Sequence, residues 1–380
     1  MKKYILITIL LLALNTLASA QEITRIWLSF KTNTPTHLVI SWQSPESGNS
    51  EVVLKVGEKE VFLAVQNEDV FIHHIEVPLL QTDVEYTYRV GTNGQKSKWN
   101  TFQGMPTKKP LKVAVFADWG FAGDADISNV LKEKPAFIIT GGDNVSSLFD
   151  FGKEGNINCV ESYLKLVDSY PELFNHFPFM PALGNHDKQL HPRGSKPPVN
   201  YMVYDTLSTA FTEFFELPGD EWKWNFEILD YDIQFFAVDL NHIGDIGKTW
   251  QTCRRYDVNS VQYKWYKFAI ESSKSTYNIT INNANSPHIR RVENGIWQNA
   301  LENNTAVITG SGYYAEVAQP NKTLYFNTSL IAGDVYADPG AIITTRERSY
   351  VLLTCYTDSL NISLKNLDSN KIIFQKTFEK

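Results

Sequence analysis

The run FMPALGNHD, residues 179–187, is an apolar segment that ends in a glycine-bearing turn carrying an amide, an imidazole and a carboxylate. Two earlier runs share this design, VAVFADWG at 113–120 and FIITGGDN at 137–144. Ligands of open α/β sheets gather at the carboxyl ends of strands, and glycine lets the backbones of adjacent loops approach closely there. The three turns are therefore predicted to meet in one site.

From residue 107 to the end, the pattern alternates buried apolar strands with amphipathic helices, which is typical of an α/β domain. Strands are predicted at 113–117, 137–140, 179–183, 235–239, 279–282 and 307–309, and helices at 159–166 and 263–270. The tail from Leu324 returns to strand after strand and is predicted to complete a second sheet. The expected architecture is two β-sheets packed face to face and flanked by helices.

Residues 21–106 carry short segments of period two separated by turn residues, which indicates an antiparallel β-sandwich of the fibronectin type III or immunoglobulin-like kind. Asn93-Gly94 has the left-handed turn chemistry that closes a hairpin. A proline-bounded linker, MPTKKP at 105–110, separates this sandwich from the α/β domain of residues 107–380.

The first twenty residues have a basic start, an apolar run and the small-residue end Ala18-Ser19-Ala20, the layout of a cleavable secretory signal over residues 1–20. The apolar run is too short to span a membrane, so no membrane span is expected after the signal is removed. We therefore expect a protein that is secreted or lies in a periplasmic or lysosome-like lumen. A net charge of -7 without a basic face argues against a nucleic-acid partner.

Three cysteines allow at most one disulfide, and Cys355 lies in an apolar run that predicts a buried thiol. Six Asn-x-Ser/Thr sequons suit a glycoprotein if the source is eukaryotic. The one at Asn144 stands beside Asp143, where a glycan would obstruct access to the predicted site.

Asp118, Asp143 and Asn185 offer the oxygen atoms that hard divalent or trivalent cations prefer, and an aspartate between two ions can bridge them. A pair of metal ions neutralises charge on a phosphoryl group and activates water, and a nearby histidine can protonate the leaving alkoxide. His186 is placed for that catalytic role.

The series DWG, GDN and GNHD, behind a fibronectin-like module, resembles the purple acid phosphatases of the calcineurin-like metallophosphoesterase superfamily. The resemblance implies a paired Fe/Zn/Mn centre in which Asp118 binds the first metal, Asp143 bridges and Asn185 binds the second. It also implies that His186 lies near the phosphate, and that the activity is hydrolysis of phosphate monoesters.

The same resemblance implies ligands that this chain lacks. Ser146 stands where the family has a metal-binding tyrosine, Asn285 where it has a histidine two residues before a proline, and GSGY at 310–313 where it has Gly-His-x-His. Loss of a single outer-shell group costs about 10- to 100-fold in affinity or activity, and loss of direct ligands should cost at least as much. A preformed paired centre is therefore not expected, and without the tyrosine any metal-loaded form should be colourless.

Two alternatives remain for the retained residues. Asp118, Asp143 and Asn185 hold one ion weakly, favouring Mg, Mn or Ca, or they are kept only because carboxylates and amides brace tight turns. His288, His242, His191 and Tyr313 are candidates to replace the lost ligands.

Three functions follow from this sequence. The first is a secreted phosphatase-like pseudoenzyme that binds a phosphate ester or another extracellular ligand. The second is a rewired metal-dependent phosphoesterase, and the third an adhesive protein whose sandwich presents aromatic rings. The sequence does not determine the substrate or the oligomeric state.

Overall fold

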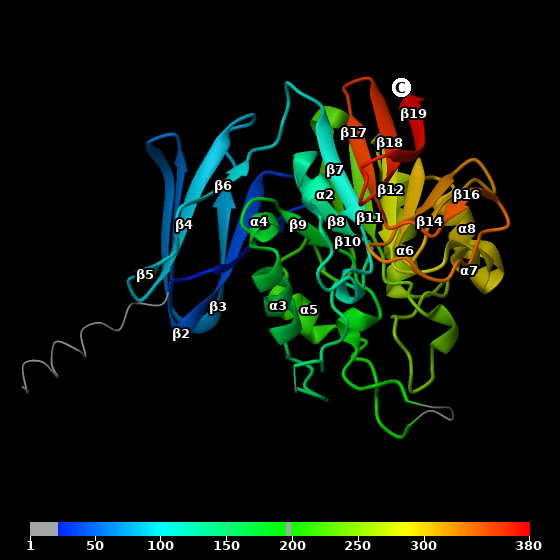
Figure 1. The fold of residues 1–380 in the computed structure, drawn as a ribbon, viewed down its shortest axis with the longest axis horizontal. Coiled ribbons are helices and arrows are strands. Elements are labelled where there is room, and N and C mark those ends of the chain that lie inside the picture. The colour runs from blue at the N-terminus through cyan, green and yellow to red at the C-terminus, as the bar shows by residue number, and fades with distance from the viewer. Residues whose placement is uncertain (1–21, 152, 195–198) are drawn as a thin grey trace, which may run out of the picture.

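The computed structural model describes residues 22–151, 153–194 and 199–380, so the predicted signal lies outside the described residues. A β-rich N-terminal region precedes a larger domain built from two sheets and their helices (Figure 1). No helix in the described part of the chain is long and apolar enough to cross a membrane.

The N-terminal strands form one hydrogen-bonded sheet rather than two separate ones. They are β1 (Arg25–Ser29), β2 (His37–Val56), β3 (Lys59–Pro78), β4 (Glu85–Thr92), β5 (Gln95–Lys96) and β6 (Asn100–Gln103). The long hairpin of β2 and β3 changes register between Gln43 and Ser50. Asn93 and Gly94 adopt positive φ of 51° and 82° and join β4 to β5, so the predicted hairpin turn is confirmed.

The first sheet of the larger domain has the order β19-β18-β17-β7-β8-β9. Its strands are β7 (Leu111–Phe116), β8 (Phe137–Thr140), β9 (Phe179–Pro181), β17 (Ser349–Cys355), β18 (Ser359–Asn366) and β19 (Ile372–Glu379). Strands β7, β8 and β9 are parallel, which brings their carboxyl ends to one edge. The three predicted strands are therefore confirmed as neighbours.

The second sheet has the order β10-β11-β12-β13-β15-β14-β16. Its strands are β10 (Trp224–Ile228), β11 (Ile233–Ala237), β12 (Tyr277–Asn282), β13 (Ala306–Thr309), β14 (Ala315–Ala318), β15 (Leu324–Asn327) and β16 (Ala341–Thr345). The prediction for the tail is only half right, because β17 pairs antiparallel with β7 and carries β18 and β19 into the first sheet. The C-terminal tail thus contributes strands to both sheets.

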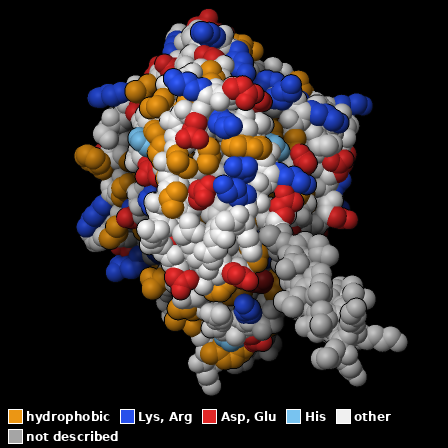
Figure 2. Space-filling view, turned by 90° about the vertical axis from the view of Figure 1, so that its left-hand side faces the viewer, with side chains coloured by type: hydrophobic (Ala, Val, Ile, Leu, Met, Phe, Trp, Pro, Cys, Tyr) orange, Lys and Arg blue, Asp and Glu red, His pale blue; other side chains and the backbone are white. Residues whose placement is uncertain are grey.

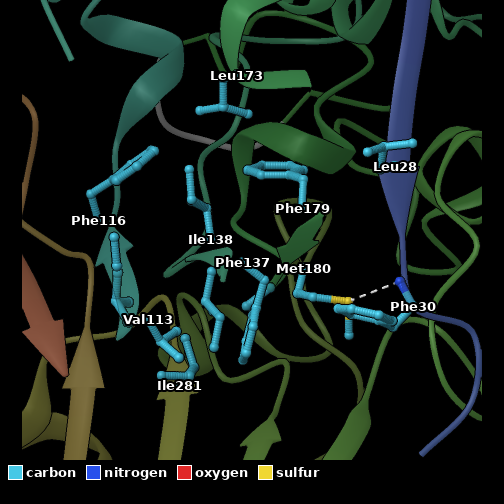
Figure 3. Packing of buried hydrophobic residues seen from close by; sticks show 14 of the residues in the cluster. Leu28, Phe30, Val113, Phe116, Phe137, Ile138, Leu173, Phe179, Met180 and Ile281 are labelled. Carbon is cyan, nitrogen blue, oxygen red and sulfur yellow. Dashed lines mark hydrogen bonds between the residues drawn. The ribbon is translucent and has the colours of Figure 1, made fainter. Parts of the chain in front are cut away.

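The two sheets pack face to face through apolar side chains (Figure 3). Phe137 of β8 meets Phe235 of β11 edge to face, with ring centroids 5.6 Å apart. Val113 of β7 and Ile281 of β12 belong to the same buried cluster. This shared core fixes the two sheets relative to each other, and with them the loops at their carboxyl ends.

Helices cover the outer faces of both sheets (Figure 1). Those beside the first sheet are α2 (Ser128–Lys132), α3 (Glu161–Ser169), α4 (Pro171–Phe174) and α5 (Thr209–Phe214); those beside the second are α6 (Val261–Ser272), α7 (Ser286–Arg291) and α8 (Ile296–Leu301). Helix α6 packs Tyr266 against Phe236 of β11, with ring centroids 5.9 Å apart. The predicted helices are confirmed, with slightly different ends.

The N-terminal region packs on the larger domain through buried contacts. Trp27 of β1 stacks on Phe214 of α5 at 4.1 Å between ring centroids and donates its indole N–H to the Phe214 carbonyl at 3.1 Å. Phe30 lies in the same buried cluster as Met180 of β9, and its amide donates to the Met180 sulfur at 3.4 Å (Figure 3). One hydrophobic core therefore runs through both parts of the chain.

All three cysteines are buried and unbonded to one another. Cys355 is fully buried on β17, as its apolar run predicts, and burial raises the pKa of its thiol. The fold therefore depends on its apolar core and has no disulfide framework.

Candidate functional site

The loops after β7, β8 and β9 meet at a pocket of about 1000 Å³. Asp118, Asp143, Asn185 and His186 all line it, so the structure brings the four predicted site residues together. The rest of the wall comes from the loops after β11, β12 and β13 and from the segment between β15 and β16. This location follows from the parallel strands, whose carboxyl ends point to the same edge.

Glycines let these loops approach one another at the base of the pocket. A Cβ atom on Gly310 would lie 1.9 Å from the Cβ of Ala117, and one on Gly184 would lie 2.1 Å from the amide nitrogen of Asp143. Both distances are far below van der Waals contact, so any larger residue would have to push backbone aside.

Replacing Gly310 by alanine is expected to destabilise the protein by about 1–3 kcal/mol, because the new methyl group overpacks a buried loop junction. Chemical denaturation followed by fluorescence measures the change in the free energy of unfolding. Gly244→Ala is the matched control for backbone effects, because Gly244, like Gly310, does not have a positive φ and a Cβ there would meet only the His288 ring at 3.6 Å, an ordinary contact. Equal losses in both variants would contradict the proposed steric cause.

Asp118 is the buried carboxylate with the most unusual environment. Its side chain is 1% exposed, and neither carboxylate oxygen has a hydrogen-bond partner in the described structure. Burial raises the pKa of Asp118 well above its usual value, and the charge of Asp143 raises it further. The nearby Ser329 side chain lowers this pKa, but by less than the other two effects raise it. An unpartnered buried carboxylate is unfavourable by itself, and a bound cation would satisfy it.

Asp143 differs because one of its oxygens is already engaged. Its Oδ1 accepts a hydrogen bond of 3.0 Å from the backbone N–H of His186, which ties the loop after β8 to the loop after β9. Asp118 and Asp143 both have positive φ, at 58° and 53°. Aspartate tolerates this region better than most residues, and such conformations cluster at functional sites.

His186 is oriented by its neighbours. Its Nδ1 lies 2.7 Å from the carbonyl oxygen of Ser146, and because a carbonyl only accepts, Nδ1 carries the proton. Phe121 meets the imidazole edge to face, with centroids 4.4 Å apart. The neutral ring therefore keeps Nε2 as an acceptor, and it can donate from Nε2 only when it is doubly protonated.

The loop after β12 places amides where the resemblance implies a histidine. Asn283 is buried beside Gly142 and donates to the Gly310 carbonyl at 2.5 Å. Asn285 instead precedes helix α7, with its Nδ2 3.4 Å from the Tyr314 hydroxyl. Asn283 therefore touches the Asp143 loop, and Asn285, the position that the resemblance implies, also lines the pocket.

The loop after β13 carries Ser311 and Tyr313 into the pocket wall. Tyr313 has a φ of 62°, and its ring meets Phe121 at 5.7 Å between centroids. Burial raises the pKa of Tyr313, and the charges of Asp118 and Asp143 raise it further. A protonated phenol therefore faces the two carboxylates on this side.

The candidate replacement histidines divide into two groups. His242 and His288 line the pocket. His191 does not line the pocket, because its Nδ1 lies 2.8 Å from a Glu154 carboxylate oxygen and its ring packs on Tyr201.

In the described residues, no three His, Cys, Asp or Glu side chains are grouped so that they could hold a metal ion. The unpartnered oxygens of Asp118, with Asp143 and Asn185 in the same pocket, are donors of the kind that a hard cation prefers.

Two supporting carboxylates were missed from the sequence. Asp187 accepts hydrogen bonds from the backbone amides of Gly184, at 2.7 Å, and Asn144, at 3.2 Å. Its pKa is raised to about 7, mainly by burial and to a smaller extent by the negative charge of Asp143. Asp239 accepts from Lys188 at 2.7 Å, and both side chains are fully buried. The only sequence signal for Asp187 was its place as the last residue of GNHD at 184–187. Nothing in the sequence indicated that Asp239 pairs with Lys188.

Asn144 is part of the same support. It is 1% exposed, and its Nδ2 donates to the Ala182 carbonyl and to Asp187, each at 3.0 Å. A glycan on this nitrogen would replace one of its two N–H hydrogens and remove one of these bonds, and a side chain that is 1% exposed leaves no room for a sugar. The folded protein therefore does not fit a glycan on Asn144 as a block at the pocket entrance.

Asn144 is expected to be unmodified in folded protein secreted from a eukaryotic host, and the exposed Asn303 is the expected carrier of a glycan. Enzymatic deglycosylation in heavy-oxygen water followed by peptide mass mapping reports the occupancy of each sequon. A glycan on Asn144 in the folded fraction would contradict this placement.

Comparisons with known proteins agree with the geometry. A family model described as calcineurin-like phosphoesterase matches residues 111–310. Two solved structures are similar over most of the chain. The purple acid phosphatase PPD1 from yellow lupin (Lupinus luteus) seeds has 15% identity and a TM-score of 0.69, covering 94% of this chain and 74% of its own. PhoD has 13% identity and a TM-score of 0.68, covering 95% and 91%. The sequence matches no curated protein.

Proposed function

Since the chain belongs to the calcineurin-like phosphoesterase family, we propose that it is a secreted, purple acid phosphatase-like member that binds a phosphate ester or related extracellular ligand with little or no hydrolysis. The family normally holds two metal ions between histidine and carboxylate ligands. The observation that carries the proposal is the chemistry of the loops after β12 and β13. At the three positions where the resemblance implies histidines, they present Asn285, Ser311 and Tyr313 to the pocket.

Binding without catalysis is consistent with the remaining wall of the pocket. His242, His288 and Arg291 line it and offer positive or hydrogen-bonding groups to an anion. Burial lowers the pKa of His242, so this ring is mainly neutral near pH 7, and Arg291 is the permanent cation. The Asp118 and Asp143 side would repel an anion unless a cation or protons neutralise it.

A single-ion phosphoesterase is the second candidate, favoured by the unpartnered oxygens of Asp118. Asp118, Asp143 and Asn185 would hold the ion, which would neutralise negative charge on a phosphoryl group. His186, held by Ser146 through Nδ1, would present Nε2 toward the leaving group. This arrangement would favour Mg, Mn or Ca over Zn or iron because its donors are oxygen atoms.

Elemental mass spectrometry on purified protein, after dialysis against a metal-buffered solution, separates these functions. The proposal expects no stoichiometric iron, zinc or manganese and no hydrolysis of 4-nitrophenyl phosphate above that of a heat-denatured sample. About two tightly held ions per chain would overturn it. Hydrolysis that depends on added Mg, Mn or Ca and is abolished by Asp143→Asn would establish the single-ion enzyme instead.

Secretion and the nature of the N-terminal region belong to the same proposal. A basic and then apolar start supports export, and N-terminal sequencing of secreted protein would test for a first residue at Gln21. A fibronectin-like or immunoglobulin-like origin of residues 21–106 is supported by the antiparallel pairing of β1 to β6. We propose that this module mainly packs on the phosphoesterase domain.

A further inference from the structure

A groove of about 330 Å³ lies between the outer face of the β10–β11 hairpin and helix α6. It shares no lining residue with the pocket described above. Asn225 and Glu227 of β10 line it, and Glu227 pairs across the strands with Gln234 of β11, which also lines it. Because side chains alternate along a strand, these three project from the same face.

Helix α6 supplies the opposite wall with two aromatic rings. Trp265, Phe268, Ala269 and Ser272 line the groove, and their spacing of three and four residues puts them on one face of the helix. Phe268 is 73% exposed, and Lys223 holds the Trp265 ring with its Nζ 4.7 Å from the centroid. The wall formed by α6 is therefore aromatic, and the wall formed by β10 and β11 carries amide and carboxylate groups.

Gln234 presents its amide to the groove. The residue is 7% exposed, and its amide makes no hydrogen bond to another described side chain or carbonyl, but its polar atoms are not among the fully buried ones and remain accessible from the groove. Water in the groove can satisfy the amide, and a ligand that displaces this water must replace its hydrogen bonds or lose affinity.

Its neighbours on the sheet also keep free hydrogen-bonding capacity. Asn225 uses its Oδ1 to accept from Asn33 at 2.7 Å, and Glu227 uses one oxygen to accept from Ser275 at 3.0 Å. That leaves the Asn225 amino group as a donor and the second Glu227 oxygen as an acceptor. Donors and acceptors thus alternate along the polar wall.

The charge in the groove is balanced, with Glu227 opposed by Lys274. A phosphate ester would meet a carboxylate there, and an entirely apolar ligand would leave Gln234 unsatisfied. A sugar combines hydroxyls, which both donate and accept, with an apolar face of C–H groups suited to aromatic rings. We propose that the groove formed by β10, β11 and α6 is a binding site for a neutral carbohydrate.

Saturation-transfer difference NMR on the full chain tests this with the methyl glycosides of glucose, galactose, mannose and N-acetylglucosamine. At least one should receive saturation from the protein. Phe268→Ala and Gln234→Leu should each weaken its binding by about tenfold or more, as expected when a central contact is removed. Val261→Ala is the matched control on the same helix, since Val261 is 71% exposed and lies outside the groove.

Gln234→Leu also separates binding from folding. Leucine has nearly the same size, and the Gln234 amide makes no hydrogen bond within the described protein, so the melting temperature of the variant should stay close to that of the parent protein while sugar binding falls. The proposal is overturned if none of the four glycosides receives saturation, or if both groove variants bind as well as the control. Metal content and phosphate ester hydrolysis play no part in either result.

Discussion

Lys188→Met is expected to destabilise the protein by about 3–5 kcal/mol, the usual cost of leaving one member of a buried ion pair alone. Lys188 Nζ lies 2.7 Å from Asp239 Oδ1, and both side chains are fully shielded from water. Asn241 also donates to that oxygen at 2.7 Å, but a neutral amide cannot replace the lost charge. The other carboxylate oxygen keeps Arg254, whose Nη1 is 3.8 Å away, a longer contact that compensates the lost lysine only in part and puts the expected loss at the lower end of this range. Because Lys188 lies in the turn that carries Asn185 and His186, the same change should loosen the pocket.

Urea denaturation measures this effect, and two further variants identify its cause. The double variant Lys188→Met/Asp239→Asn removes both charges and should recover most of the loss. Lys267→Met breaks only a surface pair with Glu271, at 4.0 Å, and should cost less than about 1 kcal/mol. A double variant as unstable as Lys188→Met would show that the loss comes from packing and not from the unpaired carboxylate.

Ser311→His/Tyr313→His is expected to raise the affinity for zinc by at least about 100-fold, since each restored ligand should contribute about tenfold or more. Both positions line the pocket with Asp118 and Asp143. Tyr313 has a φ of 62°, and histidine is among the residues that adopt this region more readily. Two imidazoles would supply the nitrogen donors that zinc prefers.

Competition with a chromophoric chelator measures the zinc affinity of this double variant and of the parent protein. Ser311→Ala/Tyr313→Ala controls for the loss of the serine and tyrosine. Adding Asp118→Asn to the histidine variant should remove most of the gain. A gain that survives Asp118→Asn would place the zinc elsewhere, and no gain at all would mean that the loop after β13 cannot direct ligands into the pocket.

Local apolar patterns predicted much of the fold because the central strands are buried on both faces. The runs that end at Asp118, Asp143 and Asn185 are continuous and flanked by glycine turns, so their neighbouring positions followed from the general behaviour of parallel sheets. The tail could not be assigned in the same way. Strand β17 is buried much as β13 to β15 are, and only its pairing with β7 decides which sheet the end of the chain joins.

The sequence predicted the site residues that stand in recognisable local motifs. It did not predict the residues whose role depends on a contact with a distant part of the chain. Spacing before Pro287 indicated Asn285 alone, and only the approach of the loop after β12 to Gly142 shows that Asn283 also lies against the Asp143 loop. Asp239 looks like any acid after a strand until Lys188, far away in the chain, is seen to reach it. Long-range contacts of this kind leave no periodic signal in a single sequence.

The stacking of Trp27 on Phe214 and the contact of Phe30 with Met180 bear on how the chain can be cut. A protein prepared without residues 21–106 would leave the partners of Trp27 and Phe30 facing water, and the N-terminal region prepared alone would expose the other half of the same surface. Both pieces should aggregate or misfold, and the whole chain should melt in a single transition. Truncation at the linker is therefore a poor way to assign activities to the two parts, and point substitutions in the full chain are the appropriate tool.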